Sequence, residues 1–446
     1  MSKKVVFTLL VVMGLMLAAC GPAATPEASE APATEAPTEA ATEAATEAPA
    51  VPEMCMGAQP GDTVTVMYQW SGTEEEKINA ILAPLVETCG IQIVAESTRD
   101  DAVLDARVQS QPPDILFWPN ISPLRLYTDR LQNLDAVGAN AENYAPYWIE
   151  MGTVDGRWLA IPVKADIKSI IWYSPAQFEL YGYQVPTTFE ELEALVEQMV
   201  ADGNVPWSMG MESGAATGWT GSDFIQDLLL VQQGPDYVMG LIDGSIPYND
   251  PGVVQAYETY VRWASDPRYT VGGAIGTLNT SFLDAIYITF AEPPQAMMVK
   301  QSGFAGGEIV SRYPTLVYGE DFDFFPFPGA QGMQGGADFM MVFNDTPAVR
   351  AVVAYLTGPE GAAAWAQVGF DLSPNLLATG QYADPQLAKK AEALANASGF
   401  TPDMGDTIGA PFGEAEWAAI IAAVQGEDIP TVLQAAAEAQ AEALGR

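Results

Sequence analysis

The sequence predicts an α/β protein with a mostly parallel, doubly wound sheet, because strands and helices alternate along its first half. TVTVMY (63–68), IQIVAE (91–96) and PDILFW (113–118) are apolar runs of strand length, and helical patterns over 74–89 and 100–110 connect them. Strand–helix–strand repetition with short connections is typical of parallel sheets. The 446 residues, 49% of them hydrophobic, suffice for two domains with sizeable cores.

The first twenty residues predict an export signal. Lys3 and Lys4 precede an apolar run over 5–19, which is short for a transmembrane helix and typical of a signal peptide. LAAC (17–20) resembles the lipobox of bacterial lipoproteins, which implies that Cys20 is lipidated and becomes the N-terminus. The alternative is an ordinary signal peptide with an incidental cysteine.

Residues 21–53 predict a disordered tether. They are almost entirely Ala, Thr, Glu and Pro, so they cannot bury enough apolar surface to offset the entropy of ordering. Proline and like-charged glutamate keep such a segment extended. A lipid at one end and a fold at the other would make this segment a spacer between membrane and domain.

Two further cysteines form an even pair in an exported chain, where disulfides persist. A strand over 63–68 followed by its return helix brings Cys89 back to the edge where the strand began. Cys55 enters at that same edge. We therefore expect a Cys55–Cys89 disulfide, with two free buried thiols as the alternative.

The charge and composition exclude several classes of function. The formal net charge is −39, and only seven of the 57 acidic residues lie in the first 53 positions, so the acidity belongs to the folded part. Such a chain lacks the basic patches that nucleic-acid partners need. It also lacks histidine, the commonest general base and zinc ligand. We expect no catalytic residue, no cofactor and no metal, and the sequence contains no GxxxxGK[ST] phosphate loop.

Three later helices are marked by their termini. Thr188 and Glu191 form a capping box for a helix within 186–200. Thr346 and Pro347 suit the N-cap and first position of a helix over 346–358. An Ala-rich helix over 430–444 closes the chain.

Five segments in the same order resemble the extracellular solute-binding proteins of carbohydrate ABC importers, the maltodextrin-binding-protein-like family. They are PDILFW (113–118), IIWYSPAQFELYGYQVPTTFEELEAL (170–195), PPQAMMVKQSGF (293–304), GGADFMMVF (335–343) and DIPTVLQAAAEAQAEAL (428–444). VPWSMGMESGAATGWTGSDFIQDLLL (205–230) resembles a stretch of the α-glucoside-binding subgroup. The resemblance covers essentially residues 61–446, although Phe304 stands where the family often has tryptophan.

This resemblance implies a two-lobed, type II periplasmic-binding-protein-like fold, in which each lobe is a mostly parallel sheet flanked by helices and the ligand lies between the lobes. By analogy, lobe 1 comprises residues 61–164 and 296–343, and lobe 2 comprises residues 165–295 and 344–446. The chain should cross between the lobes near residues 163–166, 295 and 343–344.

Candidate ligand residues combine aromatic rings with acids and amides, because a ring covers the apolar face of a sugar while polar groups bond its hydroxyls. Trp219 stands in a loop of small residues with Glu212 and Asp223 nearby; the alternative is that its indole belongs to the core. Trp70, Glu74, Trp118 and Asn120 follow strands, at the edge where such sheets bind ligands. The resemblance adds positions after the first crossing and in the later segments. The candidates are Trp70, Glu74, Trp118, Asn120, Asp166, Glu212, Trp219, Asp223, Phe304, Asp338 and Trp417.

The resemblance implies a monomeric, exported binding protein, lipid-anchored at the cell surface or in the periplasm. It would capture a sugar, such as an α-glucoside disaccharide, and deliver it to the permease subunits of an ABC transporter. Two alternatives remain. The same fold could bind a polyamine or another cation, because aromatic rings with carboxylates also suit amines. The second alternative is a secreted glycoside hydrolase that uses a pair of carboxylates for catalysis.

Overall fold

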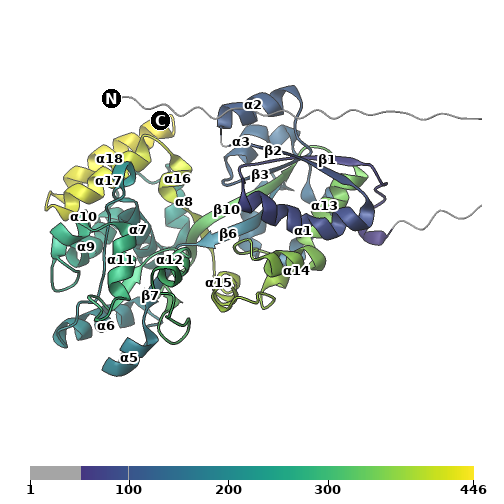
Figure 1. Ribbon diagram of the computed structural model, residues 1–446. Coiled ribbons are helices and arrows are strands. Elements are labelled where there is room, and N and C mark those ends of the chain that lie inside the picture. The colour runs from purple at the N-terminus through teal and green to yellow at the C-terminus, as the bar shows by residue number, and fades with distance from the viewer. Residues whose placement is uncertain (1–51, 99) are drawn as a thin grey trace, which may run out of the picture. The chain divides into compact units, whose positions relative to one another are not determined.

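The computed structural model describes residues 52–98 and 100–446 of the chain. The predicted signal peptide, Cys20 and all but the last two residues of the predicted tether lie outside the described residues. The described residues form one unit (Figure 1). Within the part that the structure describes, no helix has both the length and the apolar character of a membrane span.

The fold has two regions, and a six-stranded sheet lies at the centre of the first region. Its order is β11-β10-β3-β1-β2, and β6 pairs with the same β10. Three pairings are parallel (β1 with β2, β1 with β3, β10 with β11), whereas β10 is antiparallel to β3 and β6. The strands predicted near 63–68, 91–96 and 113–118 are confirmed. The bounds are β1 (Thr63–Tyr68), β2 (Gln92–Ser97), β3 (Ile115–Trp118), β6 (Ala160–Ile167), β10 (Met333–Val342) and β11 (Phe400–Pro402).

Helices cover this sheet with apolar faces. Helix α1 (Thr73–Cys89) buries Ile78, Ile81, Leu82 and Leu85, and packs against α13 (Pro347–Thr357) and α14 (Pro359–Val368). The remaining elements of this region are α2 (Asp101–Ser110), α3 (Ser122–Tyr127), α4 (Pro146–Met151), α15 (Pro385–Ala395) and a hairpin of β4 (Thr153–Val154) and β5 (Arg157–Trp158).

The predicted disulfide is confirmed. Cys55 and Cys89 are bonded, with 5.5 Å between their Cα atoms. The Gly61 N–H donates to the carbonyl of Gly90 (2.9 Å), and the Gln92 N–H donates to that of Asp62 (2.8 Å). The bridge therefore lies at the amino ends of β1 and β2, away from the carboxyl ends where the candidate aromatic residues stand.

A second, three-stranded sheet consists of β8 (Met298–Lys300), β7 (Ile170–Tyr173) and β9 (Asp323–Pro326), in that order. Its strands are all antiparallel, which differs from the mostly parallel sheet expected in each lobe. The reason is that β6 continues into β7 and β9 leads into β10. Because β6 and β10 are antiparallel, the strands attached to them are antiparallel too.

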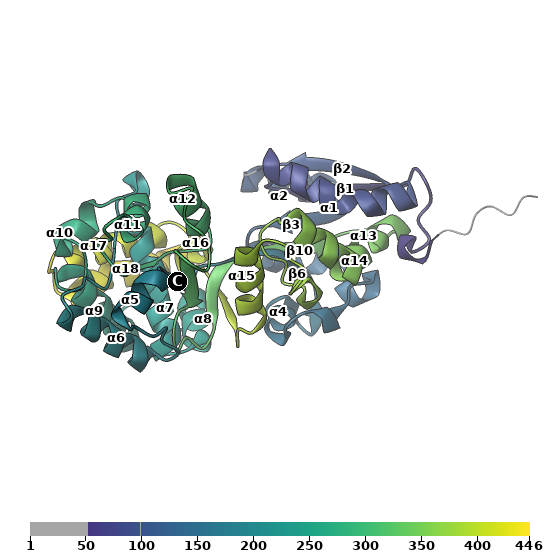
Figure 2. The same cartoon turned by 60° about the horizontal axis from the view of Figure 1, so that its bottom comes forward.

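Helix α7 (Trp219–Gln232) is the centre of a second hydrophobic core, and every residue from Gly221 to Leu230 is buried. Figure 1 and Figure 2 show α17 and α18 side by side near it. The capping box of α6 is confirmed. The other α-helices of this region are α5 (Pro175–Tyr181), α6 (Phe189–Ala201), α8 (Pro235–Asp243), α9 (Pro251–Ser265), α10 (Gly273–Asn279), α16 (Met404–Ile408), α17 (Phe412–Val424) and α18 (Ile429–Ala443). Helices α11 (Phe282–Thr289) and α12 (Ala305–Arg312) bury their apolar residues in the first core instead.

The chain passes between the two sheet regions at points that differ from the predicted crossings. It leaves β6 for β7 at residues 168–169, returns from β9 to β10 at 327–332, and leaves β11 for α16 at 403. Strands β8 and β9 pair with β7, and α13 and α14 pack on α1. Residues 298–300 and 323–326 thus belong to the second sheet and residues 347–368 pack with the first region, whereas the predicted boundaries assign them the other way round.

Candidate functional site

Three charged side chains follow one another on one face of β6 and of the extended residue directly after it. Lys164, Asp166 and Lys168 alternate with buried residues and are themselves only half-buried. Successive side chains of a strand point to opposite faces, so these three share one face. Each stands in its own group of charged partners.

Lys164 is surrounded by three carboxylates, and we call this group the Lys164 cluster (Lys164, Glu74, Asp338 and Asp371). Its Nζ atom lies 3.2 Å from Glu74, 3.3 Å from Asp338 and 3.3 Å from Asp371. Asp338 is the register partner of Lys164 on β10. Burial opposes the charge of Lys164, but the three carboxylates outweigh it and raise the pKa of the ammonium.

Trp70 supports this cluster from beneath. Its indole N–H donates to Asp338 (2.9 Å), and its ring stacks on Phe117 with 5.1 Å between centroids. Only 4% of Trp70 is exposed. Its position therefore makes it a packed support for the carboxylate.

Lys168 belongs to a second group, the junction cluster (Lys168, Asp223, Gln334 and Asp403). Its Nζ lies 3.1 Å from Asp223 Oδ1 and 2.8 Å from Asp403 Oδ2. The Gln334 amide donates to the same two oxygens, at 3.0 and 3.3 Å. Lys168, Gln334 and Asp403 stand at or beside the three chain passages between the sheet regions, and Asp223 comes from the first turns of α7. The cluster therefore ties the passages together.

Burial governs the protonation of this cluster. It raises the pKa of Asp223 to about 6, although Lys168 acts to lower it. Burial also opposes ionisation of Asp403, but Lys168 and the Asp406 N–H outweigh it and lower the pKa of that carboxyl. Burial, together with the negative charges of Asp403 and Asp223, raises the pKa of the Glu416 carboxyl to about 8. Glu416 accepts a hydrogen bond from Tyr248 (2.6 Å).

Asp166 lies between the two clusters. Loss of water around its carboxyl, together with the negative charge of Asp371, raises its pKa to about 6. The neighbouring Lys390 is buried and donates to the carbonyl of Gly303 (3.0 Å). A Cβ atom at Gly303 would come within 2.5 Å of Asp166 Oδ1, so a side chain at this position would displace the carboxylate.

Three aromatic rings gather beside the junction cluster. Trp219 lies 5.4 Å from Phe282 and 6.5 Å from Phe304, measured between ring centroids, and Lys168 Nζ lies 6.0 Å from the indole. Trp219 is half-buried and Phe304 is 38% exposed, so both offer surface to a ligand. We call Trp219, Phe282 and Phe304 the aromatic group.

The loop predicted around Trp219 is present only before it, as turns and a 3-10 helix (Gly214–Ala216), because Trp219 is itself the first residue of α7. The small residues that suggested a loop let helices approach. A Cβ at Gly218 would come within 2.7 Å of Trp417 Cβ, and one at Gly221 within 2.8 Å of Ile420. Gly218 also has φ +116°, which other residues rarely adopt. Trp417, half-buried on α17, is thereby held against the start of α7.

The remaining candidates are placed differently. Asn120 lines a cavity of about 200 Å³ together with Gly336, Asp403 and Asp406. Trp118 is 1% exposed and faces Phe339 across the sheet, within the first core. The exposed Glu212 accepts a hydrogen bond from the Gly214 N–H (3.1 Å).

The structure thus joins Glu74 and Asp338 through Lys164, with Trp70 bonded to Asp338, and it joins Trp219 and Asp223 through Lys168. Both lysines, together with Asp371 and Asp403, were missed by the sequence reasoning. One signal was present for the lysines: KADIK (164–168) alternates charged and apolar residues around a predicted site residue. Asp371 has φ +49°, an uncommon backbone conformation for a non-glycine residue that is typical of functional sites.

Comparisons with known proteins agree with this architecture. The sequence profile for the bacterial extracellular solute-binding protein family matches residues 69–363. The chain is 32% identical to the alpha-glucosides-binding periplasmic protein AglE of Rhizobium meliloti (strain 1021), over 82% of this chain and 84% of AglE. It is 31% identical to the osmoprotective compounds-binding protein GgtB of Synechocystis sp. (strain ATCC 27184 / PCC 6803 / Kazusa), over 83% of this chain and 90% of GgtB.

Solved structures show the same fold. The bacterial solute receptor AcbH matches with a TM-score of 0.74 at 20% identity, over 86% of this chain and all (100%) of AcbH. RafE from Streptococcus pneumoniae matches with a TM-score of 0.68 at 17% identity, over 87% of this chain and 99% of RafE. These likenesses confirm the predicted two-lobed, type II periplasmic-binding-protein-like fold.

Proposed function

Because this chain belongs to the bacterial extracellular solute-binding proteins, we propose that the solute it binds is a sugar, delivered to the permease subunits of an ABC transporter. We propose further that the sugar is an α-glucoside such as a disaccharide. The similarity to AglE, which is named for α-glucosides, supports this choice, as does the segment around Trp219.

The observation that carries the proposal is the aromatic group beside the junction cluster. Trp219 and Phe304 present ring surface next to the Lys168 ammonium and its carboxylates. A sugar ring needs this combination, since its C–H face packs on an aromatic ring while its hydroxyls bond charged and amide groups. Ammonium and carboxylate together supply both donors and acceptors for hydroxyls.

We assign the roles as follows. Trp219 and Phe304 would stack on the ligand, with Trp417 at the side of the site. Asp166 and Asn120 would bond its hydroxyls, and the Lys164 cluster would approach it from the first sheet region. Asp223 is 2% exposed, so its contribution would be to hold Lys168 in place.

We also propose that Cys20 carries a lipid that anchors the protein outside the cytoplasmic membrane. The support is the sequence LAAC ahead of an Ala/Thr/Glu/Pro segment. Cys20→Ser should release the protein to the medium or leave it unprocessed. Detergent-phase partitioning that persists in this variant would contradict the anchor.

Calorimetric titration tests the sugar. The purified protein without its signal peptide should bind a disaccharide from a panel of maltose, sucrose and trehalose, and Trp219→Ala should weaken that binding. Binding of putrescine in place of every sugar would favour a polyamine receptor. Release of the chromophore from a chromogenic α-glucoside would favour a hydrolase. Either result would overturn the proposal.

A further inference from the structure

Lys390, on α15, is a buried lysine that belongs to neither the Lys164 cluster nor the junction cluster. It is 8% exposed. Its helix is fixed to the first region, because Ala391 and Leu394 pack in the first core and the Tyr147 hydroxyl donates to the carbonyl of Leu394 (3.2 Å). Burying an ammonium group costs free energy unless its partners compensate the cost. The partners of Lys390 therefore indicate its role.

The ammonium of Lys390 binds the turn that carries Phe304, which we call the Phe304 turn (residues 301–305). It donates to the carbonyl of Gly303 (3.0 Å). The two carbonyls before that one accept hydrogen bonds from the indole N–H of Trp172 (3.1 and 3.3 Å). Trp172 stands on β7 of the second sheet, whereas Lys390 reaches the turn from the first region. Lys390 thus ties the Phe304 turn to the first region.

Two glycines bring the Phe304 turn into close contact with α15. A Cβ atom at Gly303 would lie 3.3 Å from Lys390 Nζ. A Cβ atom at Gly306, in the first turn of α12, would overlap the side-chain amide of Gln386, one helical turn before Lys390 on α15. Helix α15 therefore contacts the chain both before and after the aromatic residue of the turn.

From these contacts we propose that Lys390 is a positioning residue for the ligand, because its bond to the Gly303 carbonyl holds the ring of Phe304 where the sugar stacks. The inference rests on the proposed sugar function. Phe304 is 38% exposed, and its ring centroid lies 6.5 Å from that of Trp219 and 6.2 Å from that of Phe282. A ring that is fixed before the ligand arrives does not have to be ordered on binding, which strengthens the binding.

A competing role for Lys390 is to compensate the charge of Asp166, which attracts the ammonium and is itself assigned to the hydroxyls of the sugar. Loss of sugar affinity in Lys390→Met would fit both roles. A double-mutant cycle with Phe304→Ala separates them. If Lys390 acts through Phe304, its replacement costs no further affinity once the ring is gone.

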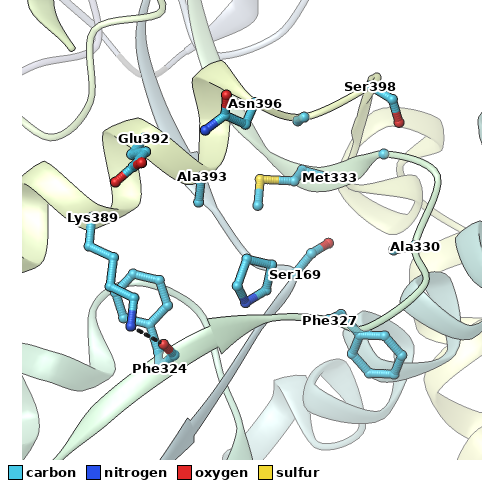
Figure 3. A pocket seen from close by; sticks show the side chains of 13 residues that line it. Ser169, Phe324, Phe327, Ala330, Met333, Lys389, Glu392, Ala393, Asn396 and Ser398 are labelled. Carbon is cyan, nitrogen blue, oxygen red and sulfur yellow. Dashed lines mark hydrogen bonds between the residues drawn. The ribbon is translucent and has the colours of Figure 1, made fainter. Parts of the chain in front are cut away.

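Lys389 supplies a matched control, because it is the preceding residue on the same helix and carries the same charge. Its Nζ lies 2.7 Å from Asp323 and donates to the carbonyl of Phe324 (2.6 Å), as Figure 3 shows. Lys389 therefore joins α15 to β9 rather than to the Phe304 turn. Lys389→Met and Lys390→Met remove equal charges from adjacent positions, and methionine keeps most of the buried volume.

Calorimetric titration uses whichever of maltose, sucrose and trehalose the wild type binds most tightly. Lys390→Met should weaken this binding about fivefold, and Lys389→Met less than twofold. In the Phe304→Ala background, Lys390→Met should change the affinity less than twofold. Lys390→Gln, with the same expected results, replaces Lys390→Met in every arm if Lys390→Met does not fold.

Hydrogen–deuterium exchange of the ligand-free protein tests the inference without a sugar. The N–H groups of Gly303 and Ala305 donate to the carbonyls of Ile167 and Ser302. Lys390→Met should accelerate their exchange about fivefold, and Lys389→Met less than twofold.

Unchanged exchange in Lys390→Met overturns the inference whether or not a sugar binds. Equal losses of affinity in the two lysine variants overturn it as well, as does an undiminished loss in the Phe304→Ala background. If exchange is accelerated in Lys390→Met and the wild type binds none of the three sugars, the hold of Lys390 on the Phe304 turn stands and the proposed sugar function fails.

Discussion

Lys164 lies on β6 and Lys168 directly after its end, four residues further on and on the same face; carboxylates bind both, yet their clusters differ in exposure. The partners of Lys164 keep 35%, 11% and 52% of their side chains exposed, whereas those of Lys168 keep 3% and 13%. An exposed carboxylate can exchange its partner for water or for a ligand. A buried one cannot be left unpaired without a large penalty. The carboxylates of the Lys164 cluster can therefore exchange a partner for a ligand, whereas those of the junction cluster hold Lys168 and the chain passages in place.

Replacing the two lysines gives the largest contrast. Lys168→Met leaves Asp223 and Asp403 buried without their cation, and we expect a loss of about 3–5 kcal/mol in the free energy of unfolding. Lys164→Met leaves carboxylates that water can reach, and we expect a loss of about 1–2 kcal/mol. Urea unfolding at pH 7 measures both. Equal losses would show that exposure does not separate the clusters.

The tryptophan beside each cluster provides the second contrast. Trp70 is buried under the Lys164 cluster, so Trp70→Ala should cost about 3–5 kcal/mol of stability. Trp219 is half-buried, so Trp219→Ala should weaken disaccharide binding at least tenfold, about 1.4 kcal/mol, while the ligand-free melting temperature changes little. Calorimetric titration and a thermal melt of each variant separate the two effects. A large loss of stability with unchanged affinity in Trp219→Ala would make the indole a core residue.

The elements that these variants probe were predictable from sequence to different degrees. Local patterns predicted β1, α1 and β2, the capping box at Thr188 and the disulfide, because each depends on residues close in the chain or on one return of it. The antiparallel pairing of β6 with β10 joins residues more than 150 positions apart. The hydrophobic pattern of neither strand indicates which strand it pairs with.

The Lys164 cluster and the junction cluster were not predicted from the sequence, for a similar reason. Lys168 and Asp403 are 235 residues apart in the sequence, and their contact exists only because two chain passages meet. Trp219 was assigned to a loop because glycine is a poor helix former and because small side chains offer little surface for packing. Here the lack of side chains at Gly218 and Gly221 is what allows α17 to pack closely, which is a tertiary effect.

A pH titration sharpens the comparison further. Burial raises the pKa of Asp223 to about 6, above about 3.9 in an unfolded chain, so the folded state holds this proton more tightly. Its stabilising contribution is present below pH 4 and is lost as the pH rises through 6. The wild type should therefore lose about 2–3 kcal/mol relative to Asp223→Asn between pH 4 and pH 7. Urea unfolding at each pH measures this difference, and parallel stability curves would contradict it.

The smallest effect on stability is expected at Asp371, the most exposed partner of Lys164. Asp371→Gly removes an exposed ion pair, which contributes about 0–1 kcal/mol, and relieves a backbone with φ +49°, which costs a similar amount. Asp371→Asn removes the charge but keeps a residue that tolerates this conformation. Both variants should unfold within about 1 kcal/mol of the wild type.

If the Lys164 cluster contacts the sugar, both variants of Asp371 should nevertheless bind the disaccharide several-fold more weakly, because Lys164 loses one of its three carboxylates and shifts toward Glu74 and Asp338. Unchanged affinity in both variants would remove the Lys164 cluster from the proposed site and leave the ligand to the aromatic group and the junction cluster alone.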